Sequence, residues 1–429
     1  RPTRSSSGSG LPAARRSADP RLRAASVLAR VDARGAHAAR LLGDASPFER
    51  ELVLGALRWQ GTLDALLAPH LRDALSALDP EVRAVLRAGL YEASRLDTPV
   101  PVAVAEAVRV AKELVPRASG LVNAVLRRAA SSPWPDPDDE RLPLALRFSH
   151  PEWLVRRWTA SLGAAAARAA VSAGQHPAPL TLYARVGAVL PPETGVCRLE
   201  PHPWVEGVAV VRAGAEAAIA ALRRGSTYAI DPAAVAVARL LPAAAVVADL
   251  AAAPGGKSLV LASERAGTWL VSCDRHFGRA SMMVRTLGLA ARRPAVVVAD
   301  GSRPALRRGA VGAVLLDAPC SGTGTLRRHP EIRWRLRPDD LPRLAAIQRD
   351  LASAAAALLA PGGHLLYSTC SLEPEENEEV IAGVPLEVVP LRGRLPDAAP
   401  VVELDSGGVA LLPSADSDGF TVHLLRRPA

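Results

Sequence analysis

The sequence predicts three parts in order: an all-α domain, a small α+β module, and an α/β domain built on a mostly parallel sheet. Apolar residues from about Asp19 to Ser131 recur at helical spacing, without the alternation that is typical of strands. A proline-rich acidic stretch from Ser132 to Asp139 separates this region from the rest of the chain. From Gly225 onward, apolar runs alternate with helical segments, as in a parallel sheet with helices on both faces.

Composition limits the kinds of partner that the chain can have. The chain has 429 residues, enough for two or three domains, and 49% of them are hydrophobic. Its net charge is +9, and Lys112 and Lys257 are its only lysines, so arginine carries nearly all of the positive charge. An arginine excess that acids do not balance favours a polyanionic partner such as nucleic acid.

The cysteines and the apolar runs indicate the environment of the protein. The four cysteines are Cys197, Cys273, Cys320 and Cys370. None of them has the spacing of a zinc site, and they do not suggest a disulfide framework. We recognise no signal peptide, and no apolar run reaches the ~18 residues of a membrane span. We therefore expect a cytoplasmic protein without a bound metal.

The first part is predicted to be a disordered basic arm over residues 1–18 and a bundle of five or more helices over residues 19–131. Asp79-Pro80-Glu81 resembles a helix start, with the aspartate as cap. Further helices are expected over residues 102–114 and 119–129. Basic residues recur along them, which fits either an RNA-facing surface or an ordinary solvated helix face: Arg109, Lys112, Arg117, Arg127 and Arg128.

Between the bundle and the sheet we expect a proline-rich linker over residues 132–145 and a small α+β module over residues 146–225. Its predicted elements are a helix over 151–162, strands over 180–186 and 207–211, and a helix over 215–223.

The α/β domain is expected to span residues 226–429. Its predicted parallel strands are the apolar runs Val246–Leu250, Thr268–Cys273, Ala295–Ala299, Ala313–Leu316 and Leu365–Tyr367. The first four end at or beside an acid, in the order Asp249, Asp274, Asp300 and Asp317. Later runs at 386–390, 409–412 and 420–425 are expected to close the sheet with an antiparallel edge. Pro361-Gly362-Gly363 is interpreted as the turn that precedes the last parallel strand.

Two cysteines are expected at one edge of this sheet. Cys320 follows the strand that ends at Asp317, and Cys370 follows the strand that contains Tyr367. A lone cysteine in such a place is more often a buried packing residue. Two thiols at the carboxyl ends of two strands of one sheet, where open α/β sheets bind ligands, instead suggest a reactive pair.

A loop after the first strand has the character of a cofactor site. It is made of small residues and glycines that open a helix: Ala251, Ala252, Ala253, Pro254, Gly255, Gly256 and Lys257. Its spacing is that of neither a dinucleotide fingerprint nor a P-loop, and a purely structural turn is the alternative. Asp274 would bind ribose hydroxyls and Asp300 the adenine amine. Three strand ends suited to an adenosine favour S-adenosyl-L-methionine.

The motifs then match a known family. They are Ala252–Lys257, Asp317–Gly324, Tyr367–Ser371 with Glu375-Glu376-Asn377, Arg328–Trp334, Gln348 and Asp418-Gly419-Phe420, with Leu54–Arg58 and Val122–Arg128 in the front half. The chain resembles the Sun/RsmB-type bacterial ribosomal RNA (cytosine-5) methyltransferases. Ala251, Ile230-Asp231 and Leu182–Val186 depart from the family pattern.

The resemblance implies an all-α NusB-like N-terminal domain that binds RNA, a small α+β linker module that contacts RNA, and an α/β Rossmann-like class I S-adenosylmethionine-dependent methyltransferase domain. It implies methylation of carbon 5 of a cytosine in RNA, with 16S ribosomal RNA as the partner and a monomeric enzyme. The alternatives are another RNA such as tRNA, or a non-catalytic NusB-like RNA-binding or antitermination protein.

The chemistry requires one thiol to attack carbon 6 and a second group to assist release. Residue types alone leave open which cysteine attacks, because DNA cytosine-5 methyltransferases use the Pro-Cys cysteine, which is Cys320 here. The family resemblance assigns attack to Cys370 and assistance to Cys320. Asp317 would hold the protonated ring nitrogen 3 and would also contact the cofactor. Lys257 would serve the cofactor carboxylate or the base pocket.

Overall fold

The structure is a computed structural model that describes residues 19–429 except 186–189, 191–196, 224 and 226. The predicted basic arm, residues 1–18, lies outside the described residues. The chain forms two compact units. Of the described residues, the helical unit comprises those up to Val155 together with His329–Arg335, and the sheet unit comprises those in Arg156–Arg328 and Leu336–Ala429.

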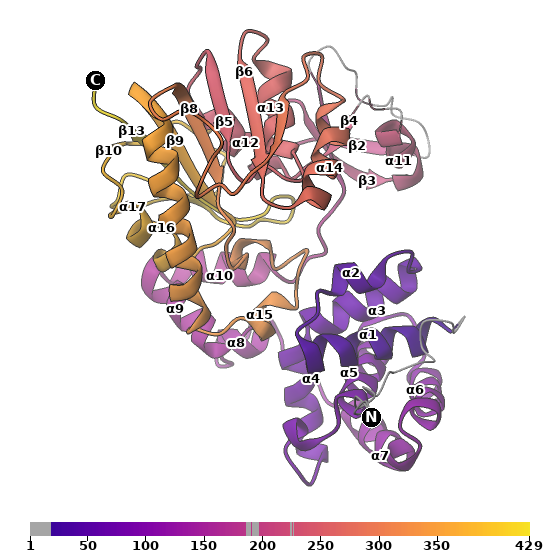
Figure 1. Cartoon of the computed structure of the whole chain (residues 1–429). Helices are drawn as coiled ribbons and strands as arrows, with labels where there is room; N and C mark the ends of the chain where they lie inside the picture. Colours follow the sequence, from indigo (N-terminus) through magenta and orange to yellow (C-terminus); the bar gives the residue numbers. More distant parts are fainter. Residues whose placement is uncertain (1–18, 186–189, 191–196, 224, 226) are drawn as a thin grey trace, which may run out of the picture. The chain divides into compact units, whose positions relative to one another are not determined.

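The described residues of the helical unit form helices and connecting loops but no strands, as predicted (Figure 1). The helices are α1 (Pro20–Arg34), α2 (Ala38–Leu42), α3 (Pro47–Arg58), α4 (Gln60–Leu67), α5 (Pro80–Arg95), α6 (Val100–Leu114), α7 (Ser119–Ala129) and α8 (Leu144–Arg147). Helix α5 packs against α1, α3, α6 and α7, so it is the centre of the bundle. Asp19 and Ser46 cap α1 and α3 through their side chains. Asp79 precedes α5 but makes no such bond, so its predicted role as a capping side chain is wrong.

Close packing explains one glycine of this core. A Cβ atom on Gly55 of α3 would lie 2.1 Å from Cζ of Tyr91, which belongs to α5. The Tyr91 hydroxyl donates to Glu51 at 2.5 Å, so the ring is held in that gap. Only glycine lets the two helices approach this closely.

The predicted linker, residues 132–145, lies within the helical unit. Trp134, in the predicted linker, packs edge-on against Trp59, with 5.1 Å between ring centroids. The Arg95 guanidinium lies 5.1 Å from both ring centroids. These contacts make the stretch part of the helical unit. The independent folding of the predicted domains stays a prediction.

A short segment from far along the chain, His329–Arg335, also belongs to the helical unit. It contains α15 (Ile332–Arg335). The Trp334 indole donates to the carbonyl oxygen of Leu57 at 2.7 Å. The fully buried Arg333 donates to the carbonyl oxygen of Ser149 at 3.1 Å. A Cβ on Gly61 would lie 2.6 Å from the Trp334 ring, so α4 is shaped to receive this segment.

The sheet unit begins with a small module. Its antiparallel sheet has the order β2-β3-β1-β4. The strands are β1 (Thr181–Ala184), β2 (Arg198–Pro201), β3 (Val208–Ala213) and β4 (Thr227–Ala229). Helices α10 (Ala164–Ala173) and α11 (Ala215–Arg223) accompany it, and α9 (Glu152–Leu162) starts in the helical unit. Both predicted strands of this module exist, and β2, β4 and α10 had no clear pattern in the sequence.

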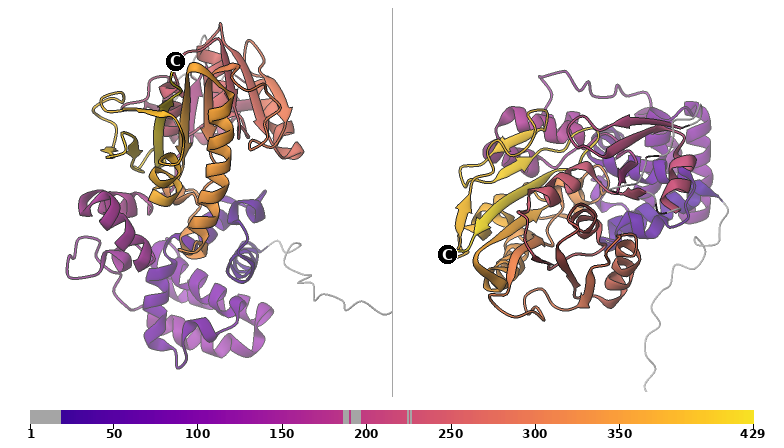
Figure 2. Two further views of the ribbon diagram at one scale, coloured as in Figure 1. Left: turned by 60° about the vertical axis from the view of Figure 1, so that its left-hand side comes forward. Right: turned by 90° about the horizontal axis from the view of Figure 1, so that it is seen from above.

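The main sheet has the order β11-β12-β13-β9-β8-β5-β6-β7, and β10 also pairs with β13 (Figures 1 and 2). The parallel strands are β5 (Val246–Asp249), β6 (Trp269–Asp274), β7 (Ala295–Val298), β8 (Val311–Asp317) and β9 (Leu359–Thr369). The antiparallel edge is β10 (Glu387–Val389), β11 (Val401–Glu403), β12 (Val409–Leu411) and β13 (Phe420–Arg426). The predicted parallel strands and antiparallel edge are confirmed.

Two apolar layers cover this sheet. One is contributed by α12 (Pro232–Leu240) and α13 (Gly256–Glu264). The other is contributed by α16 (Asp340–Leu358) and α17 (Glu378–Ile381). Helix α14 (Phe277–Leu287) packs near β6 and β7. Figure 2 shows the long helix α16 running along the sheet.

The predicted turn at Pro361-Gly362-Gly363 lies inside β9 rather than before it. The register with β8 jumps from Val311↔Leu359 to Ala313↔His364, so the intervening residues bulge out. The N–H of Gly362, whose φ is +73°, donates to the carbonyl oxygen of Arg427 at 3.0 Å. Pairing with the end of the chain therefore extends the strand through this Pro-Gly-Gly stretch.

In the part of the chain that the structure describes, no helix has both the length and the apolar character needed to cross a membrane.

Candidate active site

The two predicted thiols meet at the carboxyl edge of the sheet. Strands β8 and β9 are parallel neighbours, with Asp317 opposite Ser368. Cys320 and Cys370 lie just past these ends, each half-buried, with their Sγ atoms 3.3 Å apart. This separation is far longer than the ~2.05 Å of a disulfide and fits a hydrogen bond between sulfurs.

The surroundings favour the protonated form of Cys320. Its pKa is raised well above the usual range, first by the hydrogen bond with Cys370 and then by burial. The negative charges of Glu376 and Asp317 raise the pKa of Cys320 further. A neutral Cys320 thiol can donate a hydrogen bond to the Cys370 sulfur beside it.

Asp317 and Lys257 form an ion pair beside the thiols. The Lys257 ammonium donates to Oδ2 of Asp317 at 2.7 Å, and the Ser368 hydroxyl donates to Oδ1 at 3.0 Å. Lys257 is buried and lies 4.5 Å from the centre of the Phe420 ring. About a third of the Asp317 side chain (34%) is exposed, so a ligand can reach the carboxylate.

The predicted cofactor loop follows β5 and ends in α13. Gly255 has φ of +102°, where a Cβ would also lie 3.1 Å from Met283. A Cβ on Gly256 would lie 3.0 Å from Ile230. Ala252 and Ala253 are buried, and Ala251 and Pro254 complete the turn. No side chain among the described residues caps the first turn of α13, so its N–H groups can bind an anion.

Asp274 lies beside this loop. It is nearly buried (4% exposed), and its Oδ1 accepts from the N–H of His276 at 2.9 Å. Arg279 lies 3.6 Å from Oδ2 of Asp274 and donates to the carbonyl oxygen of Ala253 at 2.8 Å. Asp274 and the loop are thus joined through one arginine.

Asp300 follows β7, further along the same edge. It is exposed and accepts from the N–H and the hydroxyl of Ser302, at 2.9 and 2.8 Å. The backbone N–H of Ser302 is the main reason that the pKa of Asp300 is lowered. In the structure Lys257 bonds to Asp317 and Cys320 contacts Cys370. The hydrogen bonds of Asp300 to described residues lie within its own turn.

Asp249, at the end of β5, was noted in the sequence as a strand-end acid but not as a site residue. It is buried, and its Oδ2 accepts from the Ser258 hydroxyl at 2.6 Å. Burial raises the pKa of Asp249 to about 7. Its position at the end of the first predicted parallel strand is the feature of the sequence from which it could have been included in the site.

Glu376 was also missed. The sequence used it only as part of a family motif, yet it is fully buried and bonded to the segments of both thiols.

A buried cluster of ions secures the segment that follows Cys320. The fully buried Arg327 donates to Oδ1 of Asp418 at 2.9 Å, and Arg328 donates to Oδ2 of Asp231 at 2.8 Å. Asp231 also caps α12 through the N–H of Ala233. The departure from the family pattern at Ile230-Asp231 therefore keeps the aspartate that the structure uses.

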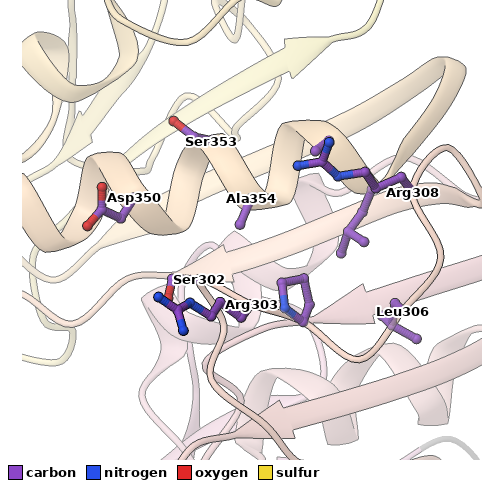
Figure 3. Close-up of a pocket in the computed structure, with 10 residues that line it drawn as sticks. Ser302, Arg303, Leu306, Arg308, Asp350, Ser353 and Ala354 are labelled. Atoms are coloured by element: carbon purple, nitrogen blue, oxygen red, sulfur yellow. The ribbon is translucent and has the colours of Figure 1, made fainter.

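A cavity of about 610 Å³ lies elsewhere on the sheet unit. Figure 3 shows Asp350, Ser353 and Ala354 on α16, with Ser302 and Arg303 opposite. None of the predicted site residues lines it. Within the described ranges, no group of three or more His, Cys, Asp or Glu side chains is arranged to hold a metal ion.

Family models match two regions of the chain. A model described as 16S rRNA methyltransferase RsmB/F matches residues 240–393, and the NusB family model matches residues 18–131. These matches confirm the helical NusB-like front region and the methyltransferase domain that the sequence predicted.

Curated relatives are similar over nearly the whole chain. The ribosomal RNA small subunit methyltransferase B of Thermus thermophilus is 37% identical over 96% of this chain and 98% of its own. The probable ribosomal RNA small subunit methyltransferase B of Bacillus subtilis is 31% identical over 88% and 89%.

Solved structures share the fold. The crystal structure of PH0851 superposes with a TM-score of 0.75 at 22% identity, covering 96% of this chain and 99% of that one. A methyltransferase homolog protein from Pyrococcus horikoshii has a TM-score of 0.54 at 23% identity, covering 66% and 97%. On the evidence of the relatives and the RsmB/F model, the chain belongs to the ribosomal RNA small subunit methyltransferase B family.

Proposed function

We propose that the protein transfers a methyl group from S-adenosyl-L-methionine to carbon 5 of a cytosine in 16S ribosomal RNA. The observation that carries the proposal is the pair of thiols 3.3 Å apart beside Asp317 at the carboxyl edge of the sheet. A protein that only bound RNA would have no use for two adjacent thiols beside a buried lysine that is paired with an aspartate.

The proposed chemistry uses a covalent adduct with the base. The Cys370 thiolate adds to carbon 6, and the electron pair of the ring double bond makes carbon 5 nucleophilic. Asp317 holds the protonated nitrogen 3 as charge builds on the ring. After carbon 5 is methylated, solvent takes its proton, and the electron pair left behind restores the ring double bond. The bond from carbon 6 to sulfur breaks at the same time, and its electron pair returns to the Cys370 sulfur. Cys320 assists this release as a neutral thiol that donates a hydrogen bond to the departing sulfur. Its raised pKa supports the assignment, since attack needs a thiolate and Cys320 is held neutral.

The residues present fit the proposed cofactor. The first turn of α13 and the loop Ala251–Gly256 would hold its carboxylate, and Asp274 would hold the ribose hydroxyls. Lys257 would balance charge between the cofactor and Asp317. Asp300 would bind the adenine amine. When bound, S-adenosyl-L-methionine supplies the electrophilic methyl group.

Charge and chemistry both support RNA as the substrate. The base must leave its stack to reach a thiol, which favours single-stranded or looped RNA. Arg127 and Arg128 of α7 are exposed and available to phosphates, in line with the +9 net charge. The names of the relatives support the small ribosomal subunit as the source of that RNA.

Tritium release tests the proposal. Ribosomal RNA labelled with tritium at carbon 5 of cytosine should lose label only when both the protein and S-adenosyl-L-methionine are present. Bisulfite mapping of 16S RNA, with transfer RNA and DNA as alternatives, should then locate the product. Release from DNA alone, or none from any RNA, would contradict the proposal.

A further inference from the structure

The Glu376 carboxylate lies beneath both thiol-bearing segments. It ends the short turn Pro374–Glu376 that follows β9, and none of it is exposed. Its Oε1 accepts from the Ser321 N–H at 2.8 Å and from Nε2 of Gln348 at 2.9 Å. Its Oε2 accepts from the hydroxyl of Ser321 and from that of Ser371, the latter at 2.5 Å.

The two serines are the residues directly after the two cysteines. Ser321 follows Cys320 and Ser371 follows Cys370, so one carboxylate bonds to the neighbours of both thiols. Gln348 of α16 also donates to the carbonyl oxygen of Pro319 at 2.9 Å, which secures the other side of Cys320. The backbone of Glu376 is fixed in turn, because Tyr367 of β9 donates to its carbonyl oxygen at 2.6 Å.

The hydrogen-bond pattern fits an ionised carboxylate. The two N–H groups can only donate to it, and Ser371 Oγ already accepts from the N–H of Glu373 at 3.1 Å, which leaves its proton for Glu376. Arg157 pairs with Glu373 and Glu375, but among the described residues no ion pair involves Glu376. Four donors, rather than a cation, thus stabilise this buried charge.

We propose that Glu376 is a positioning residue that sets Cys320 and Cys370 against each other by holding the serine after each of them. The inference rests on the proposed function and deepens it, since it names what keeps the attacking and assisting thiols in register. The charge of Glu376 also contributes to the raised pKa of Cys320. A side chain that served only to fill space in the core would have no such effect on a thiol.

Three variants of the full chain separate these roles. Glu376→Ala removes all four contacts, whereas Glu376→Gln keeps an oxygen for the two N–H donors and removes the charge. Glu379→Gln is the matched control, because Glu379 is exposed and only three residues away. Melting temperature establishes that each variant is folded before any rate is compared.

The first readout needs no substrate. The rate of Cys320 alkylation by iodoacetamide, followed by mass spectrometry across pH, should have its midpoint at lower pH in Glu376→Gln than in the wild type or Glu379→Gln. The second readout is methylation. Glu376→Ala should lower kcat by about 100-fold with little change in KM for RNA, because the thiols lose their alignment. Glu376→Gln should recover part of that loss.

Unaltered alkylation profiles in folded Glu376→Gln would overturn the inference, even if the variant were less stable. So would a wild-type kcat in Glu376→Ala. If the wild type itself methylates no RNA, the proposed function fails, and the alkylation profile still decides whether Glu376 positions the thiols.

Discussion

The carboxyl edge of the sheet has two parts that differ: the thiol edge, at the ends of β8 and β9, and the adenosine edge, at the ends of β6 and β7, where we propose that the adenosine of the cofactor binds. At the thiol edge the side chains bond to one another across strands, as Ser368 of β9 does to Asp317 of β8. At the adenosine edge Asp274 and Asp300 each accept from the backbone N–H two residues further on. The side chains of the thiol edge are therefore held by one another, whereas Asp274 and Asp300 are oriented by their own turns.

The largest effect is expected at the thiol edge. Asp317→Asn should lower the rate of methyl transfer by roughly 100- to 1000-fold, because a neutral amide stabilises the protonated ring less and leaves Lys257 without its partner. Single-turnover methylation measures this rate. Asp350→Asn, on the exposed side of α16, is the control and should behave as the wild type. A wild-type rate for Asp317→Asn would show that a group other than Asp317 stabilises the protonated ring.

A smaller effect is expected at the adenosine edge. Asp274→Ala should weaken S-adenosyl-L-methionine binding by roughly 1–3 kcal/mol, the cost of losing charge-assisted hydrogen bonds. Asp300→Ala should cost less, because Asp300 is exposed and water replaces its bonds. Calorimetry compares the two affinities. Equal losses would mean that burial does not distinguish the two acids, and unchanged affinity for Asp274→Ala would remove it from the site.

Asp249, at the end of β5 between β8 and β6, is expected to make the stability of the fold depend on pH. Its folded pKa of about 7 lies above the ~3.9 expected in the unfolded chain, so its stabilising contribution is present at low pH and is lost as pH rises towards and through 7. Asp249→Asn should therefore melt higher than the wild type at pH 8 by a few °C, since about 1 kcal/mol shifts Tm by ~2–4 °C in a domain of this size. The advantage should vanish at pH 4. A constant difference at both pH values would rule out this titration.

The smallest effect is expected from arginines of the helical unit, on the affinity for RNA. RNA affinity should fall steeply with salt. The double variant Arg127→Gln, Arg128→Gln should reduce the slope of log affinity against log salt by the amount expected for the loss of about one to two phosphate contacts. Arg109→Gln should change it little, because Arg109 already pairs with Asp19, Glu106 and Glu113. Filter binding across salt concentrations measures the slopes. An equal change of slope in the Arg109 variant would show that its ion pairs with Asp19, Glu106 and Glu113 do not keep Arg109 from binding phosphate.

The sequence could predict the features that follow from a local pattern or from a general rule of α/β sheets. The bounds of α7 follow from its apolar period, and the meeting of Cys320 with Cys370 follows from parallel strands ending at one edge. The docking of Trp334 in the helical unit could not be predicted, because it depends on a gap at Gly61, some 270 residues away in sequence and without any periodic signal.

The role of Glu376 was hidden for a similar reason. A glutamate in an acid-rich loop is expected to be exposed to solvent. Its contacts with Ser321 and Gln348 form only in the tertiary structure. The extension of β9 through Pro361-Gly362-Gly363 likewise depends on the returning strand β13.

The division of labour between the thiols is tested most directly by denaturing gels of the protein incubated with S-adenosyl-L-methionine and 16S RNA. Cys320→Ala should attack and transfer the methyl group but release slowly, so protein joined to methylated RNA should accumulate. Cys370→Ala should form no adduct and no product, and the double variant should form no adduct. An adduct from Cys370→Ala with none from Cys320→Ala would reverse the two roles, and full activity of Cys370→Ala would contradict the mechanism itself.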